Sequence, residues 1–442
     1  MSALIYWFRQ DLRLHDQPAL QQALLHAAKT NSTLLPIYCH DPMQDAPTRW
    51  GFVRMGVHRR QVLTDSLYDL DQQLQKLGSH LLVLTGKPRQ LLPQLANQIH
   101  ASQIYCEDIA APEEQDEVRA LTQAGLSVHT HWQSSLLHPA DLPFQASELP
   151  DVFSSFRQKV ERAKVAPRRP LAAPSRLPAL PDPSQGDAAL LPSLENSLSK
   201  INPTQTQPDS RTAFAYNSPS CRASEAGGLD YLQRYFATDK ASSYKETRNG
   251  LIGLDYSTKF SIWLSLGTLS PRQIDDALQD YEEQHGENDS TYWIWFELLW
   301  RDYFRFLHLK YGRRLYRARG LSDQKLPKHP AEQFQRWISG ETGQPWIDAA
   351  MRELSATGYL SNRMRQNVAS FWVHDLQGDW PAAAAWFESQ LIDYDVYSNQ
   401  GNWLYLAGRG TDPRGTRRFS PEKQAKDYDA DGAYRRLWGT LR

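Results

Sequence analysis

The chain has 442 residues, 40% of them apolar and 22% charged, with a formal net charge of −1. A charge so close to zero excludes nucleic-acid binding through the overall charge, so any such binding needs a local basic patch. Three scattered cysteines exclude a disulfide scaffold and favour a reducing, cytoplasmic location, and no apolar run approaches membrane-spanning length.

The N-terminal residues "MSALIYWFRQDLRLHD" predict a strand followed by charged residues, not a signal peptide. No CxxC or His/Cys cluster indicates a zinc site, so we expect no metal and no membrane association. A chain of this length ordinarily divides into two domains.

The first third of the chain alternates short β-like runs with helical patterns. Strands are predicted at 3–8, 34–39, 80–85, 103–107 and 127–132. Between the second and third runs, leucines from Leu63 to Leu77 recur at helical spacing. This alternation predicts βαβ units and a parallel, Rossmann-like sheet. The segment has neither GxGxxG nor GxxxxGK[ST], so it lacks both phosphate-binding signatures.

The composition then changes to Pro- and Ala-rich and polar stretches, which predict a long linker with a short helix at 151–164. From 227 onward the pattern is helical, with Pro and Gly breaks and no strand series. We therefore expect an α/β domain over 1–135, a linker over 136–226 and a larger all-α domain over 227–442.

The segment "YSTKFS" places hydroxyl groups just before an apolar helical pattern. Ser257, Thr258 and Ser261, together with the free N–H groups of a helix start, would make a phosphate cradle. Ordinary helix capping also explains this segment and, taken alone, is the favoured explanation.

The segment "YWIWFELLWRDYFRFLHLKYGRR" carries charges inside an aromatic stripe. The residues that share this helix face are Trp293, Phe296, Glu297, Trp300, Arg301 and Phe304. Charges inside the stripe, rather than opposite it, favour a functional role over a core stripe with a surface ion pair.

Asp393 and Asp395 lie among aromatic residues in "LIDYDVYSNQGNW", where a carboxylate needs a partner. Asn362 and Arg365 share a helix face in "LSNRMRQNVASFWVHDL". Arg365 with Asp393 or Asp395 is the natural buried pair, because a lone buried charge is very unfavourable. The other aspartate would then accept a hydrogen bond from a ligand.

Five segments, taken in order, resemble the photolyase/cryptochrome family and, within it, the DASH cryptochromes. They are "WFRQDLRLHD", "TRNGLIGLDYSTKFS", "ELLWRDYFRF", "SNRMRQNVASF" and "LIDYDVYSNQGNW", and the ending "YDADGAYRRLW" is similar too. They fall in both expected domains and omit only the linker. The resemblance implies an FAD held in a bent shape inside the helical domain.

By this resemblance Tyr244 and the 257–261 segment take the FAD phosphates, and Asn362 and Arg365 flank the isoalloxazine. Asp393 would pair with Arg365, while Asp395 would accept from a flavin ring N–H. The residues implied for FAD are Tyr244, Ser257, Thr258, Lys259, Phe260, Ser261, Arg301, Asn362, Arg365, Asp393, Asp395 and Asn399.

The implied reaction is the light-driven splitting of a cyclobutane pyrimidine dimer by an electron from excited, reduced FAD. The implied catalytic residues are Glu297, Trp300 and Asn399. A protonated Glu297 would hydrogen-bond the pyrimidine carbonyls, whereas an ionised one would repel the dimer anion. Trp300 would stack on the unstacked lesion, and Asn399 would approach the flavin N5.

Tyr405 stands where double-strand-acting photolyases usually have Trp, a replacement that DASH proteins share. The resemblance thus implies a single-stranded substrate, because extruding a paired lesion costs more. Arginines would meet the phosphates, although a solvated basic surface also explains such a cluster. They are Arg409, Arg414, Arg417 and Arg418, with Arg313, Arg314 and Arg317 as further candidates.

Photoreduction requires a path of aromatic residues to the surface, and Trp403 and Trp380 match the family's two inner tryptophans. The outer one should lie near residue 327, where "QKLPKHPAEQF" contains no Trp. Either another aromatic residue completes the path or photoreduction is slow. We interpret Trp337 and Trp346 as core residues.

Glu107 looks like the position that contacts a methenyltetrahydrofolate antenna in the family's α/β domain. Two other functions stay open: a blue-light photoreceptor with the same flavin, and a colourless nucleic-acid-binding protein without catalysis. The retained Glu297, Trp300 and Asn399 favour repair of dimers in single-stranded DNA. We expect a monomer.

Overall fold

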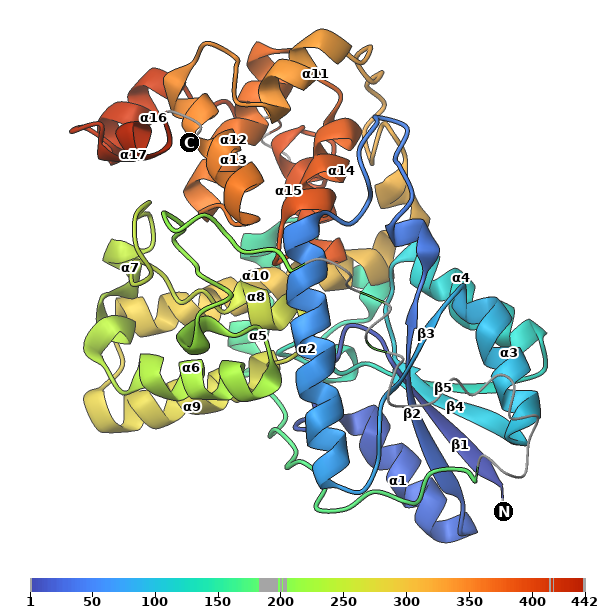
Figure 1. Cartoon of the computed structure of the whole chain (residues 1–442). Coiled ribbons are helices and arrows are strands. Elements are labelled where there is room, and N and C mark those ends of the chain that lie inside the picture. The colour runs from blue at the N-terminus through green and yellow to red at the C-terminus, as the bar shows by residue number, and fades with distance from the viewer. Residues whose placement is uncertain are drawn as a thin grey trace.

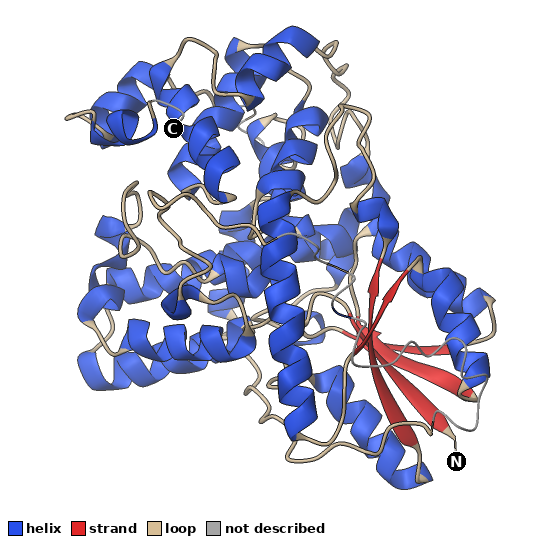
Figure 2. Ribbon diagram, viewed as in Figure 1, coloured by secondary structure: helices blue, strands red, loops and turns tan. Residues whose placement is uncertain are grey.

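The computed structural model describes residues 2–182, 198, 201, 205–412, 415 and 417–439. Five parallel strands form one sheet in the order β3-β2-β1-β4-β5 (Figures 1 and 2). The strands are β1 (Ala3–Phe8), β2 (Thr33–His40), β3 (Leu82–Thr85), β4 (Ala101–Glu107) and β5 (Ser127–His131). The interleaved helices are α1 (Pro18–Thr30), α2 (Val57–Lys76), α3 (Pro88–Gln98) and α4 (Pro112–Gln123). The predicted parallel α/β architecture is confirmed.

The central strand β1 is buried along its whole length and faces two separate cores. Tyr6 and Phe8 pack with leucines of α1 and α2, whereas Ile5 and Trp7 pack with leucines of α3 and α4. Alternate side chains of a strand point to opposite faces, so an apolar run of this kind is typical of a sheet covered on both sides.

The stretch between β5 and the helical domain is not wholly extended. It contains α5 (Phe153–Arg162), close to the predicted 151–164 helix, and its Phe153 and Phe156 belong to the core of the helical domain. The domain boundaries drawn from the sequence, at 135 and 226, stay predictions.

The larger part of the chain is helical, as predicted (Figure 2). Its α-helices are α6 (Glu225–Phe236), α7 (Tyr244–Thr247), α8 (Ser261–Leu266), α9 (Pro271–His285), α10 (Asp289–Tyr311), α11 (Ala331–Ile338), α12 (Pro345–Thr357), α13 (Asn362–Ser370), α14 (Trp380–Gln390), α15 (Val396–Leu406), α16 (Pro421–Tyr428) and α17 (Ala433–Trp438). Short 3₁₀ segments lie at Pro42–Gln44, Pro139–Asp141, Ala146–Glu148, Pro219–Cys221, Asp239–Ser243 and Gly312–Tyr316, and a π-helical turn lies at Phe371–Asp375.

Helix α10 is the centre of this domain and has 23 residues. A reciprocal cap fixes its start: the side chain of Asn288 accepts from the N–H of Thr291, and the Thr291 hydroxyl accepts from the N–H of Asn288, both at 3.0 Å. Helices α5, α7, α9 and α15 pack around it. Within the described residues, neither α10 nor any other helix is long and apolar enough to span a bilayer, and no cluster of metal-ligating side chains occurs.

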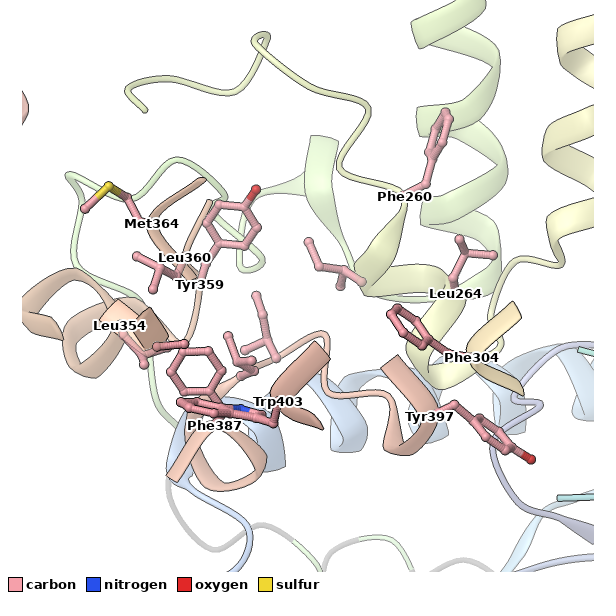
Figure 3. Close-up of a cluster of buried hydrophobic side chains, with 14 of the residues drawn as sticks. Phe260, Leu264, Phe304, Leu354, Tyr359, Leu360, Met364, Phe387, Tyr397 and Trp403 are labelled. Atoms are coloured by element: carbon pink, nitrogen blue, oxygen red, sulfur yellow. The ribbon is translucent and has the colours of Figure 1, made fainter. Parts of the chain in front are cut away.

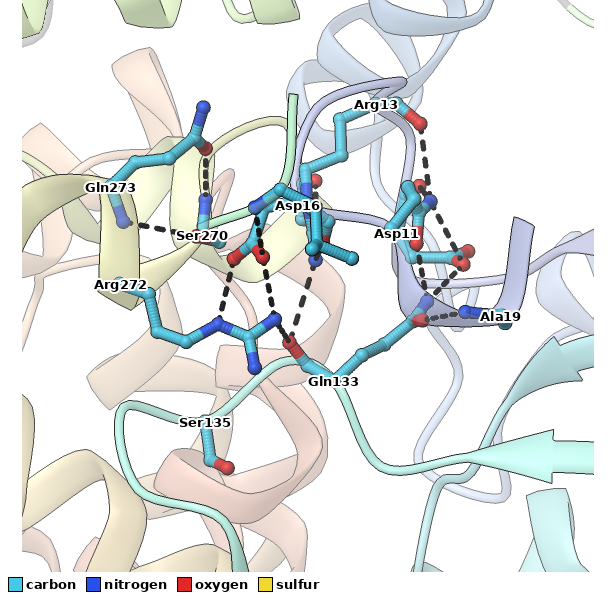
Figure 4. Close-up of polar contacts among 12 residues, drawn as sticks. Asp11, Arg13, Asp16, Ala19, Gln133, Ser135, Ser270, Arg272 and Gln273 are labelled. Atoms are coloured by element: carbon cyan, nitrogen blue, oxygen red, sulfur yellow. Dashed lines mark hydrogen bonds and ion pairs between the residues drawn. The ribbon is translucent and has the colours of Figure 1, made fainter. Parts of the chain in front are cut away.

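Buried polar contacts join the α/β domain to the helical domain (Figure 4). Arg272 of α9 donates twice to Asp16 at 2.8 Å, and these side chains are 5% and 0% exposed. Glu225 of α6 accepts from the backbone N–H groups of Leu14 and His15, both at 2.8 Å. Because buried charges need partners, these contacts fix the two domains relative to each other.

Candidate cofactor and substrate site

A cavity of about 480 Å³ lies between the segment before α8, the middle of α10, the start of α13 and α15. This volume is within the ~300–1,000 Å³ of ordinary small-molecule sites. The cavity joins residues that the sequence analysis selected from separate stretches. Those that line it are Tyr244, Ser257, Thr258, Lys259, Phe260, Ser261, Glu297, Trp300, Arg301, Asn362, Arg365, Asp393, Asp395, Tyr405 and Arg417.

Arg365 and Asp393 form an ion pair at the cavity wall. Nη2 of Arg365 donates to both carboxylate oxygens of Asp393, at 2.9 and 2.8 Å, and Nε donates to the Leu360 carbonyl at 2.8 Å. Burial lowers the pKa of Arg365, but the adjacent Asp393 carboxylate outweighs it, so that pKa lies above its ordinary value. The pair expected from the sequence is therefore present, with Asp393 as the partner.

Asp395 also lines the cavity, but it already has protein partners. Its Oδ2 accepts from Arg305 at 2.9 Å and lies 3.8 Å from Arg301, while its Oδ1 accepts from the N–H of Ser398 at 2.7 Å and caps α15. Burial raises the pKa of Asp395, and the two arginines overcome that effect and hold it below its ordinary value. A ligand N–H that donated to Asp395 would therefore share the carboxylate with these protein donors.

The segment before α8 presents donors to the cavity. The N-cap of α8 is Phe260, without a side-chain cap, and no hydrogen bond within the described chain engages the hydroxyls of Ser257, Thr258 or Ser261. Lys259 has the left-handed φ of 57°, and its Nζ donates to the Tyr359 hydroxyl at 2.9 Å. Side-chain capping therefore does not explain these hydroxyls.

Lys259 is buried, with 3% exposure, and its Nζ lies 3.2 Å from the Tyr256 ring centroid. Burial lowers the pKa of Lys259 well below its ordinary value, against the smaller opposing effect of Glu353. An anion in the cavity would favour the charged lysine. Uncommitted hydroxyls beside such a lysine fit the diphosphate of FAD.

Glu297 is paired with Arg248, not with Arg301 on its own helix. Nη1 of Arg248 donates to Glu297, and the Trp293 indole N–H donates to the same oxygen at 3.2 Å. Burial raises the pKa of Glu297, and Arg248 partly offsets this. Arg301 instead donates to the backbone carbonyls of Ser134, at 2.5 Å, and Leu264, at 3.0 Å.

Aromatic residues form the other end of the cavity. Trp300 stacks on Phe153 of α5 with ring centroids 3.7 Å apart, and meets Tyr405 edge-on at 6.3 Å. The guanidinium of Arg417 lies 5.0 Å from the Tyr405 ring. A second cavity of about 450 Å³ shares Trp300, Phe304 and Tyr405 with the first.

Asn399, Trp403 and Trp380 do not line the cavity. Helix α15 turns Ser398, Asn402 and Tyr405 toward it, so Asn399 lies on an adjoining face, where its amide donates to the Ala384 carbonyl at 3.1 Å. Trp403 is in the buried cluster that also contains Leu360 of the cavity wall (Figure 3). The indole N–H of Trp380 donates to the Ala318 carbonyl at 2.9 Å.

Two of the arginines selected for phosphate contact have protein partners. Arg409 is 5% exposed and donates to the backbone carbonyls of Gln324, at 2.7 Å, and Lys325, at 2.8 Å, so the structure argues against this assignment. Arg418 is exposed and pairs with Asp375 at 2.6 Å. Arg414 lies outside the described residues.

The further candidates lie on or beside the Gly312–Tyr316 turn, at the end of α10. Arg313 pairs with Asp116 of α4, and the Arg314 guanidinium lies 5.3 Å from the Tyr311 ring. None of Arg313, Arg314 and Arg317 lines the described cavities.

Glu107 ends β4 and is 1% exposed. Its Oε2 has no hydrogen-bond partner among the described residues. Burial, with a contribution from Asp11, raises the pKa of Glu107 to about 7.

Two arginines that pair with carboxylates of the cavity were not predicted from the sequence: Arg248, which pairs with Glu297, and Arg305, which pairs with Asp395. Arg248 stands inside the quoted stretch "TRNGLIGLDYSTKFS", and Arg305 lies one helical turn after Arg301. The i,i+4 spacing from Arg301 was a usable signal for Arg305. Nothing local linked Arg248 to a glutamate 49 residues away.

Known proteins resemble this chain in sequence and in fold. The family model for the FAD binding domain of DNA photolyase matches residues 293–439, and that for DNA photolyase matches residues 4–177. The Cryptochrome DASH of Synechocystis is 45% identical over 98% of this chain and 87% of that protein. The crystal structure of a Synechocystis cryptochrome has a TM-score of 0.90 and 44% identity, covering 99% of this chain and 88% of the other. A bacterial class III photolyase from Agrobacterium tumefaciens has a TM-score of 0.79 and 26% identity, covering 99% and 86%.

Proposed function

The chain belongs to the photolyase/cryptochrome family, with Cryptochrome DASH proteins among its relatives, and we propose that it repairs cyclobutane pyrimidine dimers in single-stranded DNA by electron transfer from light-excited FAD. One observation carries the proposal. The same cavity is lined by the hydroxyl-bearing segment from Ser257 to Ser261 and by the aromatic rings of Trp300 and Tyr405. A cofactor and an unstacked lesion would therefore lie side by side.

Bound FAD would supply one electron to the dimer in its excited, reduced form and recover it after the ring has opened. The hydroxyls of the 257–261 segment and Lys259 would hold the diphosphate. Arg365, kept charged by Asp393, would place positive charge at the isoalloxazine end. Because the Arg365 charge is already fixed in place, the protein would not have to reorganise when an electron is transferred.

Glu297 would act on the lesion. Its carboxyl lies in the cavity, one helical turn before Trp300, and burial already favours its neutral form. We propose that Glu297 is protonated in the complex and donates a hydrogen bond to a pyrimidine carbonyl, where negative charge develops. Arg248 opposes this while it pairs with the carboxylate, so a DNA phosphate that attracted Arg248 would favour the active form.

Two features support a single-stranded substrate. Tyr405 has a smaller side chain than Trp with which to replace an extruded lesion in a duplex. A lesion that is already unpaired would enter the cavity at a lower free-energy cost. Arg417 is a cation at the cavity, beside Tyr405, and would meet a backbone phosphate of the extruded nucleotides.

The test uses purified protein with its native cofactor and dimer-containing oligo-dT. Blue light should remove dimers from single strands after the protein has been reduced, and more slowly from duplexes. Glu297→Ala should slow splitting while flavin stays bound. A yellow protein that photoreduces but removes no dimers would instead support the photoreceptor function, and a colourless one would remove the basis of the proposal.

We also propose that a folate antenna, methenyltetrahydrofolate, contacts Glu107. The unpartnered Oε2 supports this, because a buried carboxyl oxygen ordinarily accepts a hydrogen bond and a pterin ring offers N–H donors. Absorption spectra of wild type and Glu107→Ala after addition of the folate test it. Equal folate uptake by both proteins would contradict it.

A further inference from the structure

Arg305 lies behind the cavity wall rather than in it. This arginine of α10 is 3% exposed, and its Nη2 donates to Oδ2 of Asp395 at 2.9 Å. The same carboxylate oxygen lies 3.8 Å from Arg301. Asp395 lines the cavity, whereas Arg305 does not. Arg305 therefore reaches the cavity through Asp395.

The Arg305 guanidinium also lies at the interface between the two domains. It is 4.4 Å from the ring centroid of Tyr397 on α15. The Tyr397 hydroxyl accepts from the backbone N–H of Ala110 at 2.7 Å, three residues after Glu107 at the end of β4. One guanidinium thus contacts both the carboxylate at the cavity and the ring that is hydrogen-bonded to the α/β domain.

The neighbouring turn of α10 is anchored at the same interface. Arg301 donates to the carbonyl of Ser134 at 2.5 Å. The carboxylate of Asp302 accepts from the backbone N–H groups of Leu136 and Leu137, at 2.9 and 2.7 Å, and is 0% exposed. Because fully bonded buried networks are rigid, this part of α10 is fixed relative to the end of β5 and the segment that follows it.

Glu107 and Arg305 are both buried, and each has a polar atom without a partner. Oε2 of Glu107 and Nε of Arg305 have no hydrogen-bond partner among the described residues. Burial lowers the pKa of Arg305, but Asp395 and, to a lesser extent, Glu107 outweigh it and hold that pKa above its ordinary value. Burial and Asp11 raise the pKa of Glu107, and Arg305 gives the largest opposing effect. The guanidinium therefore interacts with two carboxylates, one from each domain.

We propose that Arg305 is a positioning residue that links the charge of Glu107 to the flavin. By donating to Asp395, Arg305 disperses the negative charge of the carboxylate that a flavin ring N–H would share. An ionised Glu107 attracts the same guanidinium, so Asp395 presents more negative charge to the cavity and disfavours an anionic, reduced flavin. A ligand that donates to Oε2 of Glu107 therefore changes the stability of the reduced state. The inference rests on the proposed function, because it requires bound FAD.

The test measures the reduction potential of bound FAD by equilibration with a dye of known potential. This potential gives the ratio of the affinities for reduced and oxidised FAD. The measurement is made at pH 8, above the pKa of Glu107 of about 7, so that Glu107 is ionised in the wild type. Glu107→Gln removes the charge and should raise the ratio about fivefold or more, the lower end of ordinary coupling between two sites.

Asp108→Asn is the matched control. It removes the same charge one residue along the chain, but the Asp108 carboxylate accepts from Gln115 of α4 at 2.9 Å, so the ratio should stay near that of the wild type. The effect of Glu107→Gln should disappear in an Arg305→Gln background, because no guanidinium then connects Glu107 to Asp395. A merely structural Arg305 would lower the melting temperature of that variant but leave the effect of Glu107→Gln intact.

An unchanged ratio in Glu107→Gln would overturn the inference, and so would equal changes in Glu107→Gln and Asp108→Asn. These two variants leave α10 intact, so they test the inference even if Arg305→Gln does not fold. A full effect of Glu107→Gln in the Arg305→Gln background would also overturn it. A protein that binds no FAD would contradict the proposed function itself. A flavoprotein that repairs dimers, but whose potential does not depend on Glu107, would contradict this inference alone.

Discussion

Arg248 and Glu297 form an ion pair inside the cavity, although one precedes α8 and the other lies on α10. The pair stabilises the carboxylate, while the proposed function needs the carboxylic acid. The balance between burial, which raises the pKa of Glu297, and Arg248, which lowers it, therefore sets the pH range of activity.

Arg248→Gln should move the pH profile of dimer splitting upward. Without the cation, burial raises the pKa of Glu297 further, so the protonated form persists to higher pH. Splitting by chemically reduced protein, measured across pH, checks this. Lys245→Gln is the control, because Lys245 lies over the same Trp293 ring, at 5.1 Å, but pairs with Asp289. Identical profiles for Arg248→Gln and wild type would show that the pair does not control the proton.

Asp393→Asn should release FAD and lower the melting temperature. It leaves the Arg365 charge without its carboxylate, and breaking a fully buried pair costs about 3–5 kcal/mol, less here because Arg365 is 23% exposed. Flavin absorbance after gel filtration and a thermal melt measure the two effects. The comparison variant is Asp375→Asn, whose partner Arg418 is 67% exposed and whose pair is worth under about 1 kcal/mol. Flavin retained at the wild-type level in Asp393→Asn would contradict the assignment.

Lys259 should take up a proton when an anionic ligand binds. Burial depresses the pKa of Lys259, so some of the lysine is neutral as the pH rises toward its ordinary pKa. A bound phosphate favours the charged form. FAD affinity should then fall with rising pH. Titration calorimetry in two buffers of different ionisation enthalpy measures the uptake.

Lys259→Met should abolish that proton uptake, and Lys240→Met should not, because Lys240 is a surface residue paired with Asp255. The stability of the cofactor-free protein should depend on pH in the opposite direction to FAD affinity. The unfolded chain binds more protons than the folded one between the depressed and ordinary pKa values, so the Lys259 contribution to stability increases with pH. Proton uptake by Lys259→Met equal to that of wild type would refute the role.

Gly401→Ala should distort the cavity. A Cβ at Gly401 would lie 2.1 Å from Cδ1 of Phe304. The Phe304 ring lines the cavity and would have to shift to make room for it. Overpacking of this kind typically costs about 1–3 kcal/mol. The melting temperature and flavin content should both fall. At Gly410 the nearest atom would be 3.5 Å away, so Gly410→Ala should resemble wild type. Equal behaviour of the two variants would show that Phe304 relaxes freely.

The sheet could be predicted because its information is local. The apolar runs of β1 to β5 and the helical leucine spacing of α2 each lie within one segment, and βαβ units have few ways to assemble. The Arg365–Asp393 pair could be predicted for a different reason. A carboxylate among aromatic residues needs a cation, and the candidates were few.

Other parts of the site depend on information that the sequence does not carry locally. Which face of α15 meets the cavity depends on its rotation, so Asn399 could be placed on the helix but not against a ligand. In the sequence Arg409 resembles a surface cation. In the fold it donates to the backbone carbonyls of residues 324 and 325, which lie far from it along the chain. Arg248 meets Glu297 only because α7 packs on α10.

The contact between Arg272 and Asp16 has a consequence for dissecting the molecule. Each domain supplies one member of a buried ion pair, and Glu225 supplies the carboxylate for the backbone of the α/β domain. Cutting the chain between β5 and α6 would separate these partners. It would also expose to solvent the surfaces that the two domains bury against each other. Neither fragment is expected to be stable alone, and the intact chain should melt in a single calorimetric transition.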